Sequence, residues 1–120
     1  MHVELWHNPA CSNSRNALAL IREAGIEPVV VEYLKTPPSK ARLAEVIAAA
    51  GLTVREAIRE KEAVHVEQGL GDPSLSDDDL LAAMVATPVL INRPFVVSPL
   101  GTRLARPPER VIEILPPRLA

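Results

Sequence analysis

Cysteine is nearly absent from this 120-residue sequence, which contains only Cys11. A single cysteine excludes an intramolecular disulfide and a zinc site built from several thiolates. The three histidines are scattered, and we expect His2 and His65 to be surface residues rather than metal ligands. We therefore predict a chain that binds no metal and works in a reducing compartment, the cytoplasm.

Aromatic residues, long apolar runs and an excess of either charge are also lacking. Trp, Tyr and Phe occur once each, so the core must be built from Leu, Ile, Val and Ala. No apolar run approaches the roughly 20 residues of a membrane span, and the first residues do not have the pattern of a signal peptide. The net charge of −2 provides no electrostatic attraction for nucleic acid or for an anionic membrane. An anionic ligand therefore has to be held by a local group of arginines.

The first third of the chain has the pattern of a strand–helix–strand unit. Val3–Trp6 alternates in hydrophobicity and predicts a short strand. A helix is expected from the polar loop that follows to about Ala24, where Gly25 provides a stop. Val29–Val31 is a continuous β-branched run, which predicts a strand buried on both faces.

The rest of the chain predicts several helices followed by short strands. Helix starts are expected at Ser39, at the Thr53 capping box and at Ser76. The final elements are two strands, a short third strand after a turn, and a helix that begins near Pro107; the strands are Val89–Ile91, Phe95–Val97 and Thr102–Ala105. We predict one α/β domain over residues 1–120, a four-stranded mixed sheet with helices on both faces and a helical insertion.

Cys11 is the strongest candidate for chemistry. It lies between the first strand and the first helix, where exposed N–H groups and the helix dipole favour an anion. A thiolate there has a lowered pKa, and the same N–H groups can cradle an oxyanion. Ser14 adds a hydroxyl donor and Arg15 a fixed positive charge. The alternative is a small buried apolar side chain, but the polar residues around Cys11 favour an exposed loop.

The other candidates are less distinctive. His7 can stabilise the thiolate as a cation, or can simply hydrogen-bond within the loop, and spacing does not separate these alternatives. Arg93 and Arg106 each precede a proline beside a strand, where a planar cation suits a tetrahedral oxyanion. Arg59 is expected on a helix and has no distinguishing feature. The acidic run Asp77–Asp79 is more typical of a first helical turn than of a metal site.

Four segments, in order along the chain, resemble the glutaredoxin-coupled arsenate reductases, the ArsC-like branch of the thioredoxin fold. They are His7–Asn16, Tyr33–Pro38, Leu90–Val97, and Pro99–Leu104 together with Arg106-Pro107. The resemblance implies a thioredoxin-like fold in which Cys11 is the nucleophile that forms an adduct with arsenate. It also implies that His7 tunes the cysteine and that the bond before Pro94 is cis.

The resemblance further implies the ligands and partners. Arg59, Arg93 and Arg106 match the arginines that bind the anion in that family. Glutathione attacks the adduct as a co-substrate, glutaredoxin reduces the mixed disulfide, and arsenite leaves, with no bound cofactor. Two alternatives stay open: a glutathione- or glutaredoxin-linked reductase of another substrate, and a non-catalytic regulator that binds RNA polymerase, as Spx-like relatives of this fold do.

Overall fold

The computed structural model describes residues 1–116, which form two compact units. The first unit comprises residues 1–36 and 93–116, and the second comprises residues 37–92.

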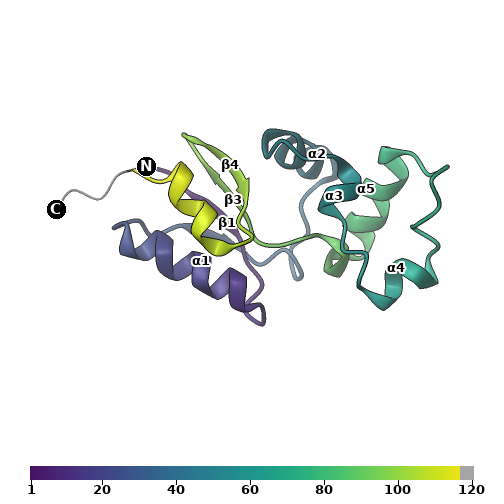
Figure 1. The fold of residues 1–120 in the computed structure, drawn as a ribbon, viewed down its shortest axis with the longest axis horizontal. Helices are drawn as coiled ribbons and strands as arrows, with labels where there is room; N and C mark the ends of the chain where they lie inside the picture. The colour runs from purple at the N-terminus through teal and green to yellow at the C-terminus, as the bar shows by residue number, and fades with distance from the viewer. Residues whose placement is uncertain (117–120) are drawn as a thin grey trace. The chain divides into compact units, whose positions relative to one another are not determined.

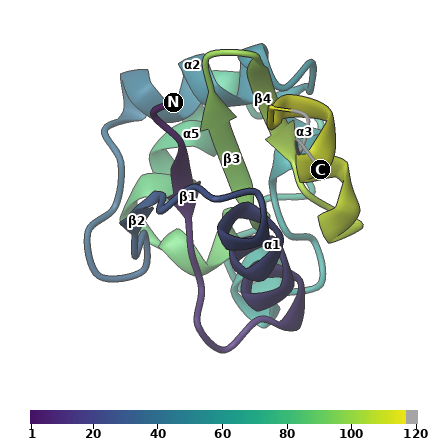
Figure 2. The same cartoon turned by 90° about the vertical axis from the view of Figure 1, so that its left-hand side faces the viewer.

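The first unit contains a four-stranded mixed sheet with the strand order β2-β1-β3-β4 (Figures 1 and 2). β1 is parallel to β2 and antiparallel to β3, and β3 and β4 form an antiparallel hairpin. The mixed sheet predicted from the sequence is therefore confirmed. The strands are β1 (Glu4–Trp6), β2 (Val29–Val31), β3 (Phe95–Ser98) and β4 (Gly101–Leu104).

One face of this sheet packs against two helices. These are α1 (Ser12–Glu23) and the 3₁₀ helix η2 (Pro108–Ile114), which lie side by side in Figure 1. Leu5 and Val96 from the sheet share a fully buried apolar cluster with Ile21 of α1. The amphipathic spacing of α1 aims its apolar side at the sheet, and Gly25, with φ of +82°, follows the helix end.

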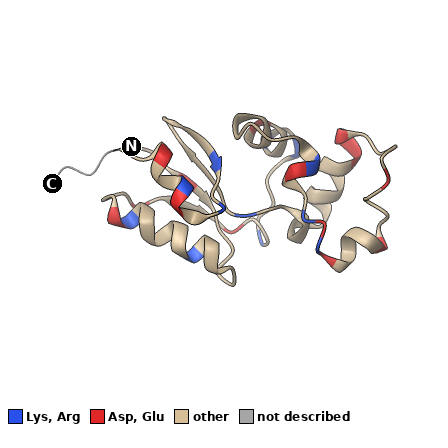
Figure 3. Cartoon of the chain, in the orientation of Figure 1, with Lys and Arg blue, Asp and Glu red and all other residues tan. Residues whose placement is uncertain are grey.

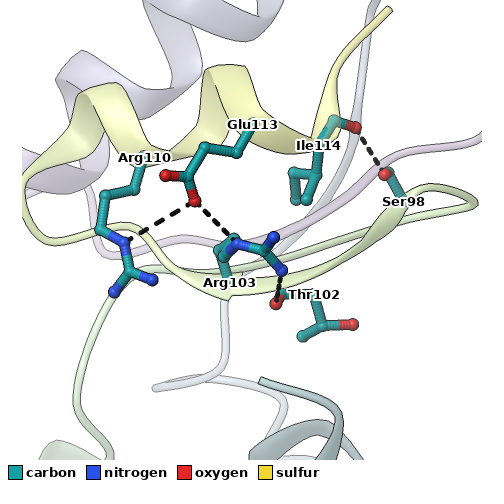
Figure 4. Close-up of polar contacts among 6 residues, drawn as sticks. All are labelled: Ser98, Thr102, Arg103, Arg110, Glu113 and Ile114. Atoms are coloured by element: carbon teal, nitrogen blue, oxygen red, sulfur yellow. Dashed lines mark hydrogen bonds and ion pairs between the residues drawn. The ribbon is translucent and has the colours of Figure 1, made fainter. Parts of the chain in front are cut away.

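Polar contacts attach η2 to the β3–β4 hairpin, as Figure 4 shows. Glu113 accepts a hydrogen bond from Arg103 at 2.8 Å and lies 3.9 Å from the Nε atom of Arg110. The Ser98 hydroxyl donates to the carbonyl of Ile114 at 2.6 Å. Exposed ion pairs contribute about 0–1 kcal/mol each, whereas burial of an isoleucine contributes about 1.5–3 kcal/mol. The buried side chain of Ile114 therefore stabilises the attachment of η2 more than the ion pairs do.

The second unit is helical. Ser39 caps its first helix through the N–H of Arg42, and Thr53 and Ser76 form full capping boxes, so all three predicted helix starts are confirmed. Asp79 completes the Ser76 box, which gives the acidic run a structural role. The elements are α2 (Lys40–Ala49), α3 (Val54–Ala57), α4 (Ala63–Glu67), α5 (Asp77–Ala86) and the 3₁₀ helix η1 (Pro88–Leu90).

The prediction that Val29–Val31 is buried on both faces is wrong. β2 lies at the edge of the sheet, and the side chains of Val29 and Val30 are 50% and 38% exposed. A β-branched run reports strand propensity, but burial depends on the position of the strand in the sheet.

The predicted strand Val89–Ile91 is also wrong, because residues 88–90 form the 3₁₀ helix η1. Pro88 has the fixed φ that suits a first helical turn. The N–H of Ile91 donates to the carbonyl of Pro88 at 2.9 Å. Ile91 still pairs with Ile58 in an isolated antiparallel bridge. Leu90 and Ile91 are thus buried without forming a strand.

One further expectation fails: His65, expected at the surface, is only 7% exposed in α4. The helix expected near Pro107 is present as the 3₁₀ helix η2, which begins at Pro108 and has Ile112 exposed while Val111 and Ile114 are buried. The tighter 3₁₀ winding changes which residues share a face.

Charged residues of both signs are interspersed along the ribbon (Figure 3). Within residues 1–116, no helix combines the length and apolar character needed to cross a membrane.

Candidate active site

Cys11 is the N-cap residue of α1 and is held there by a turn. Its N–H donates to the carbonyl of Asn8 at 2.9 Å, and its own carbonyl accepts the N–H of Arg15 at 3.0 Å. The Asn8 side chain accepts the N–H of Ala10 at 3.0 Å, a local turn that asparagine before proline favours. The sequence analysis did not assign a role to Asn8, although the Asn8-Pro9 dipeptide carries the signal for this turn.

The electrostatic surroundings of Cys11 favour a thiolate. Burial alone raises the pKa of the thiol, since Cys11 is only 9% exposed and therefore less open than its polar loop predicted. Hydrogen bonds from the N–H groups of Ser14 and Asn13, together with the Arg93 guanidinium, outweigh burial and lower the pKa below its ordinary value. The start of a helix and one cation thus supply the expected stabilisation.

His7 forms a hydrogen bond inside the loop, the second of its two sequence alternatives. Its Nδ1 atom lies 2.6 Å from the Ser14 hydroxyl, and the ring is 7% exposed. Burial lowers the pKa of His7 and so favours the neutral ring. The geometry therefore favours His7 as part of the loop scaffold over His7 as a cation beside the sulfur.

The side chains of Ser14 and Arg15 both form hydrogen bonds within the loop around Cys11. The Ser14 hydroxyl is fully buried between His7 and the N–H of Asn8, which donates to it at 3.0 Å, so only the main-chain N–H of Ser14 serves the sulfur. Arg15 is exposed and donates to the carbonyl of Pro9 at 2.8 Å. The side chain of Arg15 therefore links the start of α1 to the preceding loop at the protein surface.

Arg93 and Arg106 lie together, next to paired ends of β3 and β4. Arg106 donates through Nη1 to the carbonyl of Arg93 at 3.1 Å. The peptide bonds that follow the two arginines, Arg93–Pro94 and Arg106–Pro107, are both cis. Within the first unit, Arg106 therefore contacts Arg93, and Arg93 in turn contacts Cys11.

Arg59 belongs to the second unit and does not lie on a helix, so the helical expectation is wrong. α3 ends at Ala57, because Ile58 is extended and pairs with Ile91. The N–H of Arg59 donates to the carbonyl of Leu90 at 2.7 Å, and its side chain forms an ion pair with Glu62. The capping box starts α3, but tertiary pairing stops it after one turn.

A pH titration of Cys11 alkylation is the direct check of the thiolate. Iodoacetamide reacts with the thiolate, so its rate is expected to rise with a midpoint below the ordinary thiol pKa of about 8.5. Folding lowers this pKa, so the folded protein loses the proton first. The free energy of unfolding therefore gains a contribution as pH rises from the folded-state pKa to about 8.5, and loses it on acidification. A midpoint at or above 8.5 would contradict the electrostatic account.

No group of three or more His, Cys, Asp or Glu side chains suited to a metal ion occurs within residues 1–116. The mixed sheet, with α1 starting at Cys11 and a cis-proline at the start of β3, defines a thioredoxin-like protein with one thiol at its site. A profile of the ArsC family matches residues 6–114. The chain belongs to the ArsC family.

Relatives of the chain within this family are named arsenate reductases. The arsenate reductase of Rhizobium meliloti is 68% identical over 116 residues, which cover 97% of this chain and 83% of the relative. That of Escherichia coli K12 is 48% identical, with coverage of 96% and 82%. A solved arsenate reductase from Vibrio cholerae superposes with a TM-score of 0.92 at 49% identity, over 96% of this chain and 98% of the other.

Proposed function

We propose that this chain reduces arsenate to arsenite through the Cys11 thiolate. The observation that carries the proposal is the stabilised sulfur at the start of α1, with the Arg93 guanidinium beside it, in a chain of the ArsC family. Relatives at 48% and 68% identity are named arsenate reductases, which supports this substrate over other oxyanions.

In the first step the Cys11 sulfur attacks arsenic. A sulfur–arsenic bond forms, and one arsenate oxygen takes up protons and leaves as water. Glutathione thiolate then attacks the Cys11 sulfur, so a sulfur–sulfur bond forms and the sulfur–arsenic bond breaks. The electron pair of that bond stays on arsenic, which passes from As(V) to As(III) and leaves as arsenite. Glutaredoxin reduces the remaining mixed disulfide and regenerates the Cys11 thiol.

An external thiol is required because the chain has no second cysteine. The position three residues after Cys11 is Ser14, whose buried hydroxyl cannot close a disulfide. Glutathione and glutaredoxin therefore supply both electrons in the proposed cycle. This pairing places the protein in the cytoplasm, where such reductants are maintained.

The anion is proposed to bind the N–H groups of Asn13 and Ser14 and the guanidinium groups of Arg93 and Arg106. Arg15 adds positive charge at the start of α1, and Arg59 is proposed as a third guanidinium because the family resemblance gives it that role. The family profile spans residues from both units, which supports one ArsC-like domain; residues 117–120 lie outside the described structure.

The test is a coupled assay with purified protein, arsenate, glutathione, glutaredoxin, glutathione reductase and NADPH. We expect NADPH oxidation that requires this protein, arsenate and glutaredoxin, with arsenite as the product. Phosphate in place of arsenate is the control, because it has the same shape and charge but is not reduced. Absence of arsenite under these conditions would reject the proposal.

A further inference from the structure

Arg93 and Arg106 are held opposite each other by the end of the β3–β4 ladder. Phe95 pairs with Leu104, and the N–H of Ala105 donates to the carbonyl of Pro94 at 2.8 Å, which extends the ladder by one bond. Arg93 is the residue before this bond on one strand, and Arg106 is the residue after it on the other. Both arginines therefore lie one residue beyond this bond, which brings their main chains opposite each other.

A side-chain contact adds to this arrangement. The Nη1 atom of the exposed Arg106 donates to the main-chain carbonyl of Arg93 at 3.1 Å. A guanidinium has five N–H donors in a planar fork, so one bond to a carbonyl leaves further donors for an anion. Arg106 can thus hold Arg93 and still face a ligand.

The side chain of Arg93 also lies beside the Cys11 sulfur. The Arg93 side chain is hydrogen-bonded to Cys11 and also acts on it through its charge. The hydrogen bond from Arg106 to the Arg93 carbonyl therefore connects Arg106 to the thiol by way of Arg93.

We propose that Arg106 is a positioning residue, whose guanidinium holds the main chain of Arg93 so that the Arg93 side chain stays beside the Cys11 sulfur. This role deepens the proposed anion-binding function of the same site, and it operates in the free protein before any oxyanion binds. An arginine that served only as an anion ligand would leave the unliganded thiol unchanged.

The experiment measures the thiol pKa of the free protein from the pH dependence of iodoacetamide alkylation, without arsenate. We expect Arg106→Met, which keeps the stem but loses every donor, to raise the pKa of Cys11 by about half a unit. Arg106→Lys, which retains a charged donor, is expected to restore part of this shift. In the Arg93→Ala background, Arg106→Met is expected to have no further effect, because the pathway through Arg93 is already absent.

Arg110→Ala is the matched control, since Arg110 is also an exposed arginine of the first unit but contacts Glu113 instead. Melting temperatures verify that each variant is folded, and Arg106→Leu, which also has no donor, replaces Arg106→Met if the latter does not fold. An unchanged thiol pKa in the Arg106 variant would overturn the proposal. Additive shifts from Arg93 and Arg106 would overturn it as well. Because no arsenate is present, either result is independent of whether the protein reduces arsenate.

Discussion

Arsenate turnover is expected to fall by more than about 1,000-fold when Cys11 is replaced by serine. A serine hydroxyl fits the same space, but it is not ionised at neutral pH and cannot exchange with glutathione. The loss should appear in kcat rather than only in KM, because the N–H groups and arginines that are proposed to bind the anion remain. The coupled NADPH assay and direct quantification of arsenite measure the effect.

The Cys11→Ser variant also provides an internal check, because it leaves the chain with no thiol. Thiol reagents and glutathione disulfide should no longer modify the protein. Ser74→Ala, a change at an exposed residue of the second unit, is the control and is expected to keep full turnover. Turnover by Cys11→Ser at the rate of the original protein would show that the chemistry does not pass through this sulfur.

Arg93→Ala is the second change with a large expected effect, because it removes a proposed ligand of the anion and a cation beside the sulfur at once. Loss of a charged hydrogen bond to the anion, about 1.5–3 kcal/mol, should lower kcat/KM by roughly tenfold or more. Loss of the cation beside the sulfur should also raise the thiol pKa of Cys11 by about 1 unit, which slows alkylation at neutral pH. Steady-state kinetics and alkylation rates measure the two effects separately.

Arg93→Lys distinguishes charge from geometry. Lysine restores a positive charge but not the planar fork, so the thiol pKa should recover more than kcat/KM does. Arg110→Ala, which removes an exposed arginine of η2, should change neither quantity. If Arg93→Ala left both the thiol pKa and kcat/KM unchanged, Arg93 would have no part in the site.

The features that the sequence predicted well have local causes. The helix starts at Ser39, Thr53 and Ser76 depend on a side-chain oxygen that meets an N–H three residues later, and all three are present. Cys11 at the start of α1 follows in the same way from a polar loop between an alternating strand and an amphipathic helix. The mixed sheet follows from the order of these elements along the chain.

The features that the sequence missed depend on residues far apart in the chain. Val30 is exposed because β2 lies at the edge of the sheet. The β-branched composition of β2 does not predict this position. Arg59 leaves the helical conformation because the residue before it pairs with Ile91, more than thirty positions later. His65 is buried by the packing of the second unit, although its own segment carries no signal for burial.

The sequence by itself determined that one thiol lies at a helix start, that it has no cysteine partner within the chain, and that the family is ArsC-like. Those facts reside in residue identity and in spacing over a few positions. Only the tertiary structure decided that Arg93 lies beside the sulfur, that Arg106 donates a hydrogen bond to the Arg93 carbonyl, and that His7 is hydrogen-bonded to Ser14. Pairing of strands from opposite ends of the chain creates these contacts, because β1, which leads to Cys11, and β3, which follows Arg93, become neighbours only when the sheet forms.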